Sequence, residues 1–226
     1  VGNMMIEQVN QKPDSVLGFA TGASPVPTYK YIIKCFNEGK VSFKDITTFN
    51  LDEYCDLPVE DKNSYFTFMH ENLFNHIDVK EENVNFLNGN AKDSEAECRR
   101  YDNLINEKKI DIQLLGVGRN GHIGFNEPGS SFTGKTHIID LKESTRQANA
   151  RFFKSIDEVP KQAITMGIGT IMKSKEILLL ASGTAKAEAI RGTIHGEVTE
   201  DLPASILQTH PNVTLIVDKE AYSLCE

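Results

Sequence analysis

One loop of this sequence carries an unusual density of residues that can do chemistry. Residues Gly116–Pro128 read G-V-G-R-N-G-H-I-G-F-N-E-P and follow a strand-like apolar segment. Glycine is entropically costly, so four glycines in this stretch indicate that the backbone approaches a ligand closely. His122 and Glu127 could form a proton-transfer pair, because histidine titrates near neutral pH. A buried structural histidine is the alternative, and the neighbouring residues make it the less favoured one.

Adjacent carboxylates, Asp52 and Glu53, follow a second strand-like segment within Asn50–Tyr54 (N-L-D-E-Y). Neighbouring residues of a strand face opposite sides, so only one of the two can easily point into a given cleft. On position alone, a solvated acidic turn or the N-cap of a short helix is the favoured interpretation.

A third loop, Thr21–Pro25 (T-G-A-S-P), links a strand-like segment to a helical one. Such a loop aims backbone N–H groups and the positive end of the helix dipole outward, which suits a phosphate group. Gly22 allows close approach of the backbone, and the Ser24 hydroxyl can donate a hydrogen bond. The loop lacks the G-K-[ST] ending of a Walker A motif, and many such turns hold nothing, so both interpretations stay open.

Three cations could face an anionic ligand. Arg151 can bind a phosphate bidentately, and Lys186 lies in the first turn of a predicted helix, where a cation is mildly unfavourable unless an anion binds. Arg146, on the same predicted helix as Arg151, is interpreted as a surface charge.

Strand-like and helical segments that alternate along the chain must position these residues. The predicted strands are Val16–Ala20, Ile46–Asn50, Val84–Leu87, Ile110–Val117, Glu176–Ala181 and Val213–Val217. The predicted helices are Val1–Asn10, Pro27–Glu38, Asn63–His76 with Asn63 as N-cap, Asp93–Glu107, Glu143–Phe153, Ala163–Lys173 and Thr184–His195.

This alternation, with near-continuous apolar strands, predicts an α/β fold: a Rossmann-like parallel sheet with helices on both faces. Repeats, low-complexity tracts and linkers are not visible, so we expect one domain over residues 1–226, with a truncated N-terminus. Ligands of such sheets bind outside the carboxyl ends of the strands, where the three polar loops should converge.

Composition narrows the choice of partner. With 39% apolar and 25% charged residues the chain is typical of a soluble globular protein. A net charge of −8 without a basic patch argues against nucleic acid, and no apolar run approaches the roughly 18 residues of a membrane span. The four cysteines have neither C-x-x-C nor zinc-like spacing, which indicates free thiols, no metal site and a cytoplasmic location.

Taken together, these stretches resemble the glucosamine-6-phosphate deaminase family along nearly the whole chain. The G-H-I-G-F-N-E-P run and the L-D-E-Y loop are highly specific as a pair. The resemblance implies conversion of glucosamine 6-phosphate and water to fructose 6-phosphate and ammonia, with neither metal nor cofactor. It implies that Asp52 moves the proton between C2 and C1, and that His122 opens the sugar ring, oriented and assisted by Glu127. Positions that match the family's phosphate site are Gly22, Ala23, Ser24, Arg151 and Lys186.

Two departures from the family pattern matter. Many members carry Asp where Asn120 stands, and an amide can orient His122 but cannot stabilise its cation with a full charge. Glu127 is then the one anionic partner in the motif. Allosteric members carry basic residues at the positions of His137 and Ile139, so we expect no allosteric activation and favour a monomer over a homo-oligomer.

Three rival interpretations are weaker. A 6-phosphogluconolactonase shares a G-x-G-x-x-G-H run, but a different sequence follows the histidine and the Asp52–Glu53 loop is not expected. A non-catalytic sugar-phosphate sensor would keep the phosphate residues and lose Asp52, His122 and Glu127. A metal-dependent hydrolase would need clustered His and carboxylate ligands. The sequence therefore favours an enzyme.

Overall fold

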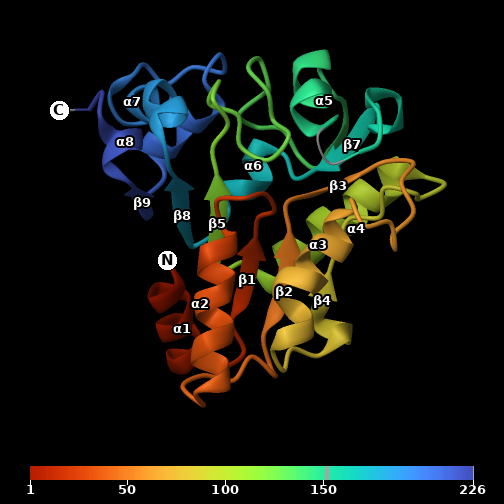
Figure 1. The fold of residues 1–226 in the computed structure, drawn as a ribbon, viewed down its shortest axis with the longest axis vertical. Coiled ribbons are helices and arrows are strands. Elements are labelled where there is room, and N and C mark those ends of the chain that lie inside the picture. The colour runs from red at the N-terminus through yellow and green to blue at the C-terminus, as the bar shows by residue number, and fades with distance from the viewer. Residues whose placement is uncertain (151–152, 226) are drawn as a thin grey trace.

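A parallel sheet forms the centre of the protein. The computed structural model describes residues 1–150 and 153–225, apart from the side chains of Ser144 and Ala148. The sheet has six strands in the order β4-β2-β1-β5-β8-β9, and every adjacent pair is parallel (Figure 1). Its strands are β1 (Val16–Phe19), β2 (Thr47–Asn50), β4 (Val84–Asn85), β5 (Ile112–Gly116), β8 (Glu176–Ala181) and β9 (Val213–Val217).

Helices cover both faces of this sheet, as predicted. Side chains of paired strand residues share a face, and Phe49 pairs with Gly18, so Phe49 and Phe19 point to opposite faces. Phe19 packs on Tyr29 of α2, with ring centroids 5.9 Å apart, and Phe49 packs on Tyr101 of α4 at 5.5 Å. The α-helices are α1 (Gly2–Gln11), α2 (Val26–Asn37), α3 (Tyr65–Asn72), α4 (Ser94–Lys108), α5 (Glu143–Asn149), α6 (Ile168–Ile171), α7 (Ala187–His195) and α8 (Lys219–Tyr222). Short 3-10 turns occupy Phe74–His76, Glu81–Asn83, Ile156–Glu158, Thr184–Lys186 and Pro203–Thr209.

The strand order reverses between β1 and β5. From β1 the chain runs outward through β2 to β4, then returns to β5 and runs outward again through β8 to β9. In parallel sheets of this kind, ligands bind outside the carboxyl ends of the strands at such a point. Thr21–Pro25 follows β1 and the glycine-rich loop follows β5, so both loops begin at this point.

A second, antiparallel sheet was not predicted. It has the order β3-β7-β6, from β3 (Asp52–Tyr54), β7 (Gln162–Thr165) and β6 (His137–Asp140). In Figure 1, β7 and α5 lie together beyond the tips of the central strands.

The prediction of a helix over Ala163–Lys173 is wrong, because its first residues form β7 and only Ile168–Ile171 is helical. Gly167 and Gly169 and several β-branched residues weaken a helix here, and strands β3 and β6 supply the hydrogen-bonding partners that favour a strand.

The predicted helix Asn63–His76 is shorter than expected and has a different N-cap. Ser64 caps α3, since its Oγ accepts a hydrogen bond from the backbone N–H of Thr67 at 3.0 Å. The helix ends at Asn72 and a 3-10 turn follows. Asp93 caps α4 in the same way, by accepting from Ala96 N at 2.9 Å. Both caps satisfy N–H groups that the first turn leaves free.

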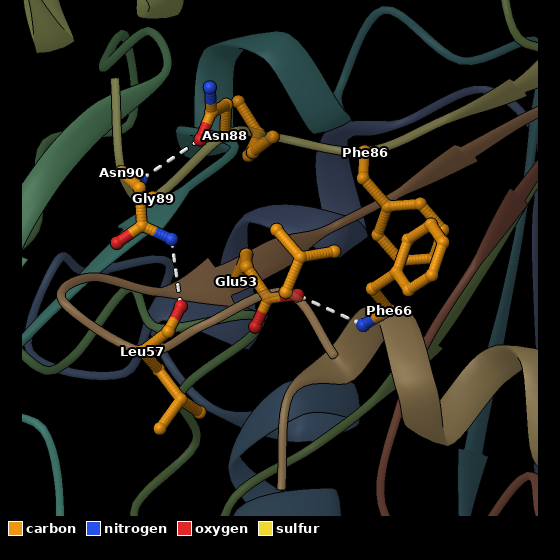
Figure 2. A pocket seen from close by; sticks show the side chains of 9 residues that line it. Glu53, Leu57, Phe66, Phe86, Asn88, Gly89 and Asn90 are labelled. Carbon is orange, nitrogen blue, oxygen red and sulfur yellow. Dashed lines mark hydrogen bonds between the residues drawn. The ribbon is translucent and has the colours of Figure 1, made fainter. Parts of the chain in front are cut away.

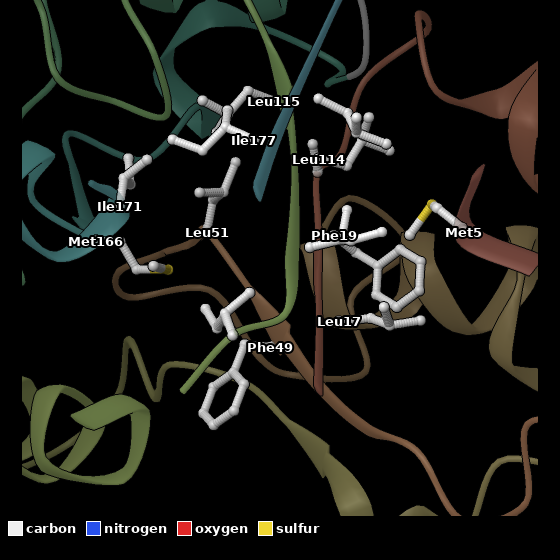
Figure 3. Packing of buried hydrophobic residues seen from close by; sticks show 14 of the residues in the cluster. Met5, Leu17, Phe19, Phe49, Leu51, Leu114, Leu115, Met166, Ile171 and Ile177 are labelled. Carbon is white, nitrogen blue, oxygen red and sulfur yellow. The ribbon is translucent and has the colours of Figure 1, made fainter. Parts of the chain in front are cut away.

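One large apolar cluster joins the sheet to the elements around it. Figure 3 shows Met5 of α1 beside Phe19, and Leu51 beside Met166 and Ile171. Met166, just before α6, and Ile171, its last residue, are fully buried, and Met166 N donates to Leu51 O at 2.7 Å. The same core therefore fixes the end of β2, where the Asp52 strand begins, and the end of β7.

Gly167 should not tolerate a side chain. A Cβ atom there would lie 2.2 Å from the carbonyl oxygen of Lys135 and 2.3 Å from that of Gly134, which are backbone atoms. We expect Gly167→Ala to lower the free energy of unfolding by about 3 kcal/mol, the upper end of overpacking effects, as measured by urea denaturation. Gly39→Ala is the control: its Cβ would meet no atom within 4 Å, and only its φ of 70° is unfavourable. That change should cost about 1 kcal/mol, so equal losses would contradict the steric argument.

Candidate active site

The glycine-rich loop after β5 is shaped around the His122 ring. A Cβ atom at Gly118 would come within 2.2 Å of that ring, so only glycine leaves room for it. Gly118 N also donates to His122 O at 2.8 Å, which closes the loop on itself. The last two glycines of the loop, Gly121 and Gly124, have φ of 81° and 58°, a region that other residues rarely adopt. Gly118 therefore serves the placement of His122, and Gly121 and Gly124 allow the turns of the loop.

The far end of the loop is tied to the second sheet. Phe125 N donates to Thr165 Oγ1 at 3.2 Å, and the Asn126 amide donates to Met166 O at 2.8 Å. A Cβ atom at Gly124 would lie 3.5 Å from Asp52 Oδ2. The carboxyl group of Asp52 is thus next to the loop that carries His122, although the two residues are 70 positions apart in the sequence.

Asn120 lies between His122 and Glu127 and bonds to both. Its Nδ2 donates to Glu127 Oε2 at 2.6 Å, and its Oδ1 lies 2.7 Å from His122 Nδ1. The direct distance from His122 Nδ1 to Glu127 Oε1 is 3.6 Å. The amide therefore mediates between the imidazole and the carboxylate.

This arrangement determines which ring nitrogen of His122 carries the proton. An ionised carboxylate only accepts, so the NH₂ group of Asn120 must face Glu127 and its oxygen must face His122. Nδ1 is then the donor to that oxygen, and Nε2 keeps its lone pair. The His122 side chain is 31% exposed and that of Glu127 only 9%, so His122 is the member that a ligand can reach.

Burial and nearby cations keep His122 neutral. Burial lowers the pKa of His122 from its ordinary 6.5; the Glu127 carboxylate opposes this effect, and the Lys186 and Lys142 charges add to it. At neutral pH the ring is an unprotonated base at Nε2. Lys142 was not singled out from the sequence, and no signal marks it except its place just before the Arg146 helix.

The structure separates the roles of the two adjacent carboxylates. Glu53 accepts backbone hydrogen bonds from Tyr54 and Tyr65 at 2.8 and 2.9 Å, and from Phe66 at 2.9 Å. It therefore holds the start of α3. Figure 2 shows its carboxylate turned toward Phe66, at a cavity of about 110 Å³ that no residue of the His122 loop lines.

Asp52 points the other way, toward Gly124, and is 7% exposed. Burial raises its pKa from 3.8 to about 8, and the Glu53 charge adds to the effect. The interpretation of this pair as a solvated acidic turn is wrong, because both residues are buried strand residues.

The loop after β1 is held at its base and open at its tip. The hydroxyl of Tyr29 donates to Ala20 O, and Ala20 N donates back to that hydroxyl at 3.3 Å. Beyond this anchor Gly22 has φ of 98°, and a Cβ atom there would meet nothing within 4 Å. Gly22 and Ala23 are exposed, and Ser24 is half-buried. The N-terminus of α2, without a side-chain cap, follows directly.

Of the predicted cations, Lys186 reaches the loop that carries His122. Its Nζ donates to Val117 O at 2.6 Å. Burial lowers the pKa of Lys186, and the charge of Arg119 lowers it further. Arg151 lies outside the described residues. These contacts place positive charge beside His122 in a protein of net charge −8.

The interpretation of Arg146 as a surface charge is wrong. Its side chain is 15% exposed, pairs with Glu143 at 3.0 Å and donates to Ile156 O at 2.8 Å. Arg146 therefore joins α5 to the following 3-10 turn, a contact between segments that helical spacing does not reveal.

Three further findings concern metal ions, membranes and the cysteines. Among residues 1–150 and 153–225, no group of three or more His, Cys, Asp or Glu side chains could hold a metal ion. No helix in the described part of the chain is long and apolar enough to span a membrane. The four cysteines are free thiols, as predicted.

Comparison with known proteins identifies the family. The sequence model of the family described as glucosamine-6-phosphate isomerases/6-phosphogluconolactonase matches residues 2–216. Glucosamine-6-phosphate deaminase 1 of Bacillus subtilis strain 168 is 55% identical over 219 residues, which cover 96% of this chain and 90% of the relative. The chain belongs to the glucosamine-6-phosphate deaminase family. The predicted family and the prediction of an enzyme are confirmed.

Two further relatives are also named as deaminases, and a more distant solved structure shares the fold. The glucosamine-6-phosphate deaminase of Oceanobacillus iheyensis is 56% identical and covers 96% of this chain and 87% of its own length. A solved structure described as a monomeric glucosamine-6-phosphate deaminase matches 99% of this chain and 93% of its own, with a TM-score of 0.96 and 54% identity. A 6-phosphogluconolactonase from Thermotoga maritima, at 20% identity and a TM-score of 0.73, shares the fold.

Asp52→Asn should stabilise the protein at high pH. Because the pKa of Asp52 is about 8 in the folded state and 3.8 ordinarily, the folded protein keeps a proton that the unfolded chain releases between these values. Stability is therefore lost as pH rises through this range. Asparagine does not titrate, so its advantage in Tm should grow from about pH 4 to about pH 8 and then stay constant.

Thermal unfolding followed by circular dichroism at about pH 5 and about pH 9 measures this difference. Glu53→Gln is the control. It should destabilise the protein at both values, because one amide oxygen cannot replace two carboxylate oxygens that accept three backbone hydrogen bonds. A Tm difference for Asp52→Asn that does not change with pH would contradict the burial argument.

Proposed function

We propose that this protein converts glucosamine 6-phosphate and water into fructose 6-phosphate and ammonia, in the cytoplasm. The observation that carries the proposal is the placement of buried Asp52 beside the loop in which Asn120 links His122 to Glu127. The deaminase names of relatives 55% and 56% identical support the overall reaction.

His122 opens the sugar ring. Its free Nε2 takes the proton from the O1 hydroxyl, and the imidazolium then returns a proton to O5 as the C1–O5 bond breaks. A lowered pKa keeps the ring in the accepting form at neutral pH. Asn120 holds the ring in the right tautomer, and Glu127, through the amide and at 3.6 Å, offsets the transient positive charge.

Asp52 moves the proton from C2 to C1 of the open chain. As carboxylate it accepts the C2 proton, and as acid it delivers that proton to C1. A proton passes from the C2 amine to O1 in the same conversion, so that C1 becomes CH₂OH and an imine is left at C2. Water adds to the imine and ammonia departs, so neither a redox step nor a metal is required. The raised pKa of Asp52 suits this work, because a base near the operating pH both accepts and returns a proton readily.

The phosphate of the substrate binds at the loop after β1. The open backbone at Gly22 and Ala23, the Ser24 hydroxyl and the free start of α2 supply donors. Lys186 and Arg151 supply positive charge, Arg151 on the strength of the family pattern.

We further propose that the protein acts as a monomer without allosteric activation. The relative of known structure at 54% identity is described as monomeric. At the positions where allosteric members carry basic residues, Ile139 can donate nothing and the His137 Nδ1 lies 2.8 Å from Lys135 O, a local contact.

The proposal is tested by the reaction and by one pair of variants. The protein should release ammonia and fructose 6-phosphate from glucosamine 6-phosphate in the presence of EDTA. His122→Gln should lower kcat on the cyclic substrate by about 10²–10⁴-fold, the contribution of a general acid–base group, and leave an open-chain analogue nearly unaffected. Coupled ammonia detection measures both.

Asp52→Asn is the matched variant, because an amide cannot accept the C2 proton. It should abolish turnover of cyclic and open-chain substrates alike, together with exchange of the C2 proton with solvent. Equal losses of His122→Gln on both substrates would contradict its assignment to ring opening. Hydrolysis of 6-phosphogluconolactone without ammonia release from the amino sugar would overturn the proposed reaction.

Lys186→Met should weaken binding of fructose 6-phosphate by roughly 1.5–3 kcal/mol, the value of a hydrogen bond to a charged group. The methionine keeps the apolar stem and removes the charge. Inhibition constants of fructose 6-phosphate and of fructose measure the effect, which should be confined to the phosphorylated sugar. Lys142→Met is the control, since Lys142 also acts on His122 but is not assigned to the phosphate. If the two variants weaken binding equally, Lys186 acts only through the general positive potential of the site and does not bind the phosphate directly.

A further inference from the structure

Thr145 of α5 contacts the acid–base group from outside the His122 loop. Its Oγ1 lies 3.0 Å from Glu127 Oε1. An ionised carboxylate cannot donate, so the threonine hydroxyl is the donor. Glu127 thus receives one hydrogen bond on each oxygen, from Asn120 on Oε2 and from Thr145 on Oε1. Both bonds together fix the rotation of the carboxylate.

The oxygen that Thr145 holds is the one that faces His122. Glu127 Oε1 lies 3.6 Å from His122 Nδ1, which is too long for a hydrogen bond, whereas Asn120 Oδ1 lies 2.7 Å from the same nitrogen. Without the threonine hydroxyl, Oε1 would lose the hydrogen bond that holds it in this rotation, close to the Nδ1 proton. A small rotation of the carboxylate would then replace the amide contact by a direct ion pair.

We propose that Thr145 is a positioning residue for ring opening: it holds Glu127 so that Asn120, and not the carboxylate, accepts the Nδ1 proton of His122. This inference rests on the proposed role of His122 in the reaction. Its consequence is a ring held in one orientation and kept only weakly basic, so that Nε2 can both take a proton from O1 and release it to O5.

A role of Thr145 in the stability of α5 alone is the competing explanation. The first-turn contact of Thr145 within the helix comes from its backbone N–H, which donates to Lys142 O at 2.9 Å, whereas its hydroxyl donates to Glu127. One turn later Asn149 makes a similar tie to the body of the protein, by donating from Nδ2 to the Tyr54 hydroxyl at 2.9 Å. Asn149 therefore offers a matched control on the same helix, with no contact to Glu127 among the described hydrogen bonds.

Three variants test the proposal in the full chain. Thr145→Val keeps the shape and removes the donor, Thr145→Ser keeps the donor, and Asn149→Ala removes the neighbouring tie. Thr145→Val should lower kcat on cyclic glucosamine 6-phosphate about tenfold, part of the 10²–10⁴-fold of a general acid–base group, with KM nearly unchanged. Turnover of an open-chain analogue by Thr145→Val should not change. Thr145→Ser should retain the wild-type rate on the cyclic substrate.

Titration of His122 by NMR gives a readout that does not depend on activity. The groups that face the ring are Glu127, Lys186 and Lys142, and the variants leave all three in place. The pKa of His122 should rise in Thr145→Val, because direct contact with a carboxylate favours the charged ring. It should be as in wild type in Thr145→Ser and in Asn149→Ala. His122→Gln identifies the signal among the six histidines.

Any other outcome contradicts either the positioning role of Thr145 or the proposed reaction. An unchanged His122 titration in Thr145→Val overturns the positioning role, whatever happens to kcat. The same shift in Asn149→Ala also overturns it, since the effect would then come from loosening α5. If wild type releases no ammonia, the proposed reaction fails, and the titration still decides whether Thr145 positions His122.

Discussion

The reversal of strand order between β1 and β5 is the constraint on which the site depends. Parallel strands present all their carboxyl ends at one edge, and only at the reversal do neighbouring crossovers diverge and leave room for a ligand. The loop with Gly22 starts on one side of that point, and the loop with His122 starts on the other. The separation of the proposed phosphate and ring-opening positions thus follows from the topology.

The second sheet adds what the parallel sheet cannot supply. Its strand β3 continues from β2 after Leu51 and carries Asp52 toward Gly124, while β7 anchors the His122 loop through Thr165. Burial in this sheet is also why Asp52 has a pKa of about 8, a property that suits the proton transfer proposed for it and lowers stability at neutral pH. The proposed function and stability therefore oppose each other at this residue.

Asn120 shows how an uncharged side chain can organise an acid–base group. By donating to Glu127 and accepting from His122, it determines the tautomer of the ring. It also separates the negative charge of the Glu127 carboxylate from His122 Nδ1. Burial and two lysines then keep the pKa of His122 low. A direct carboxylate partner would produce a more basic ring, which in the proposed reaction would release its proton to O5 less readily.

Local pattern determined the parallel sheet, its helices and the three polar loops, because apolar periodicity and glycine density are properties of short segments. The resemblance to the family, carried by the G-H-I-G-F-N-E-P and L-D-E-Y stretches, pointed to the family that the comparisons confirm. Tertiary structure alone decided that Ala163–Thr165 is a strand, because its partners lie in β3 and β6. It alone also decided that Asp52 and not Glu53 faces the His122 loop, that Arg146 is structural, and that Thr145 reaches Glu127. Each of these depends on contacts between separate elements of the structure, which no local pattern encodes.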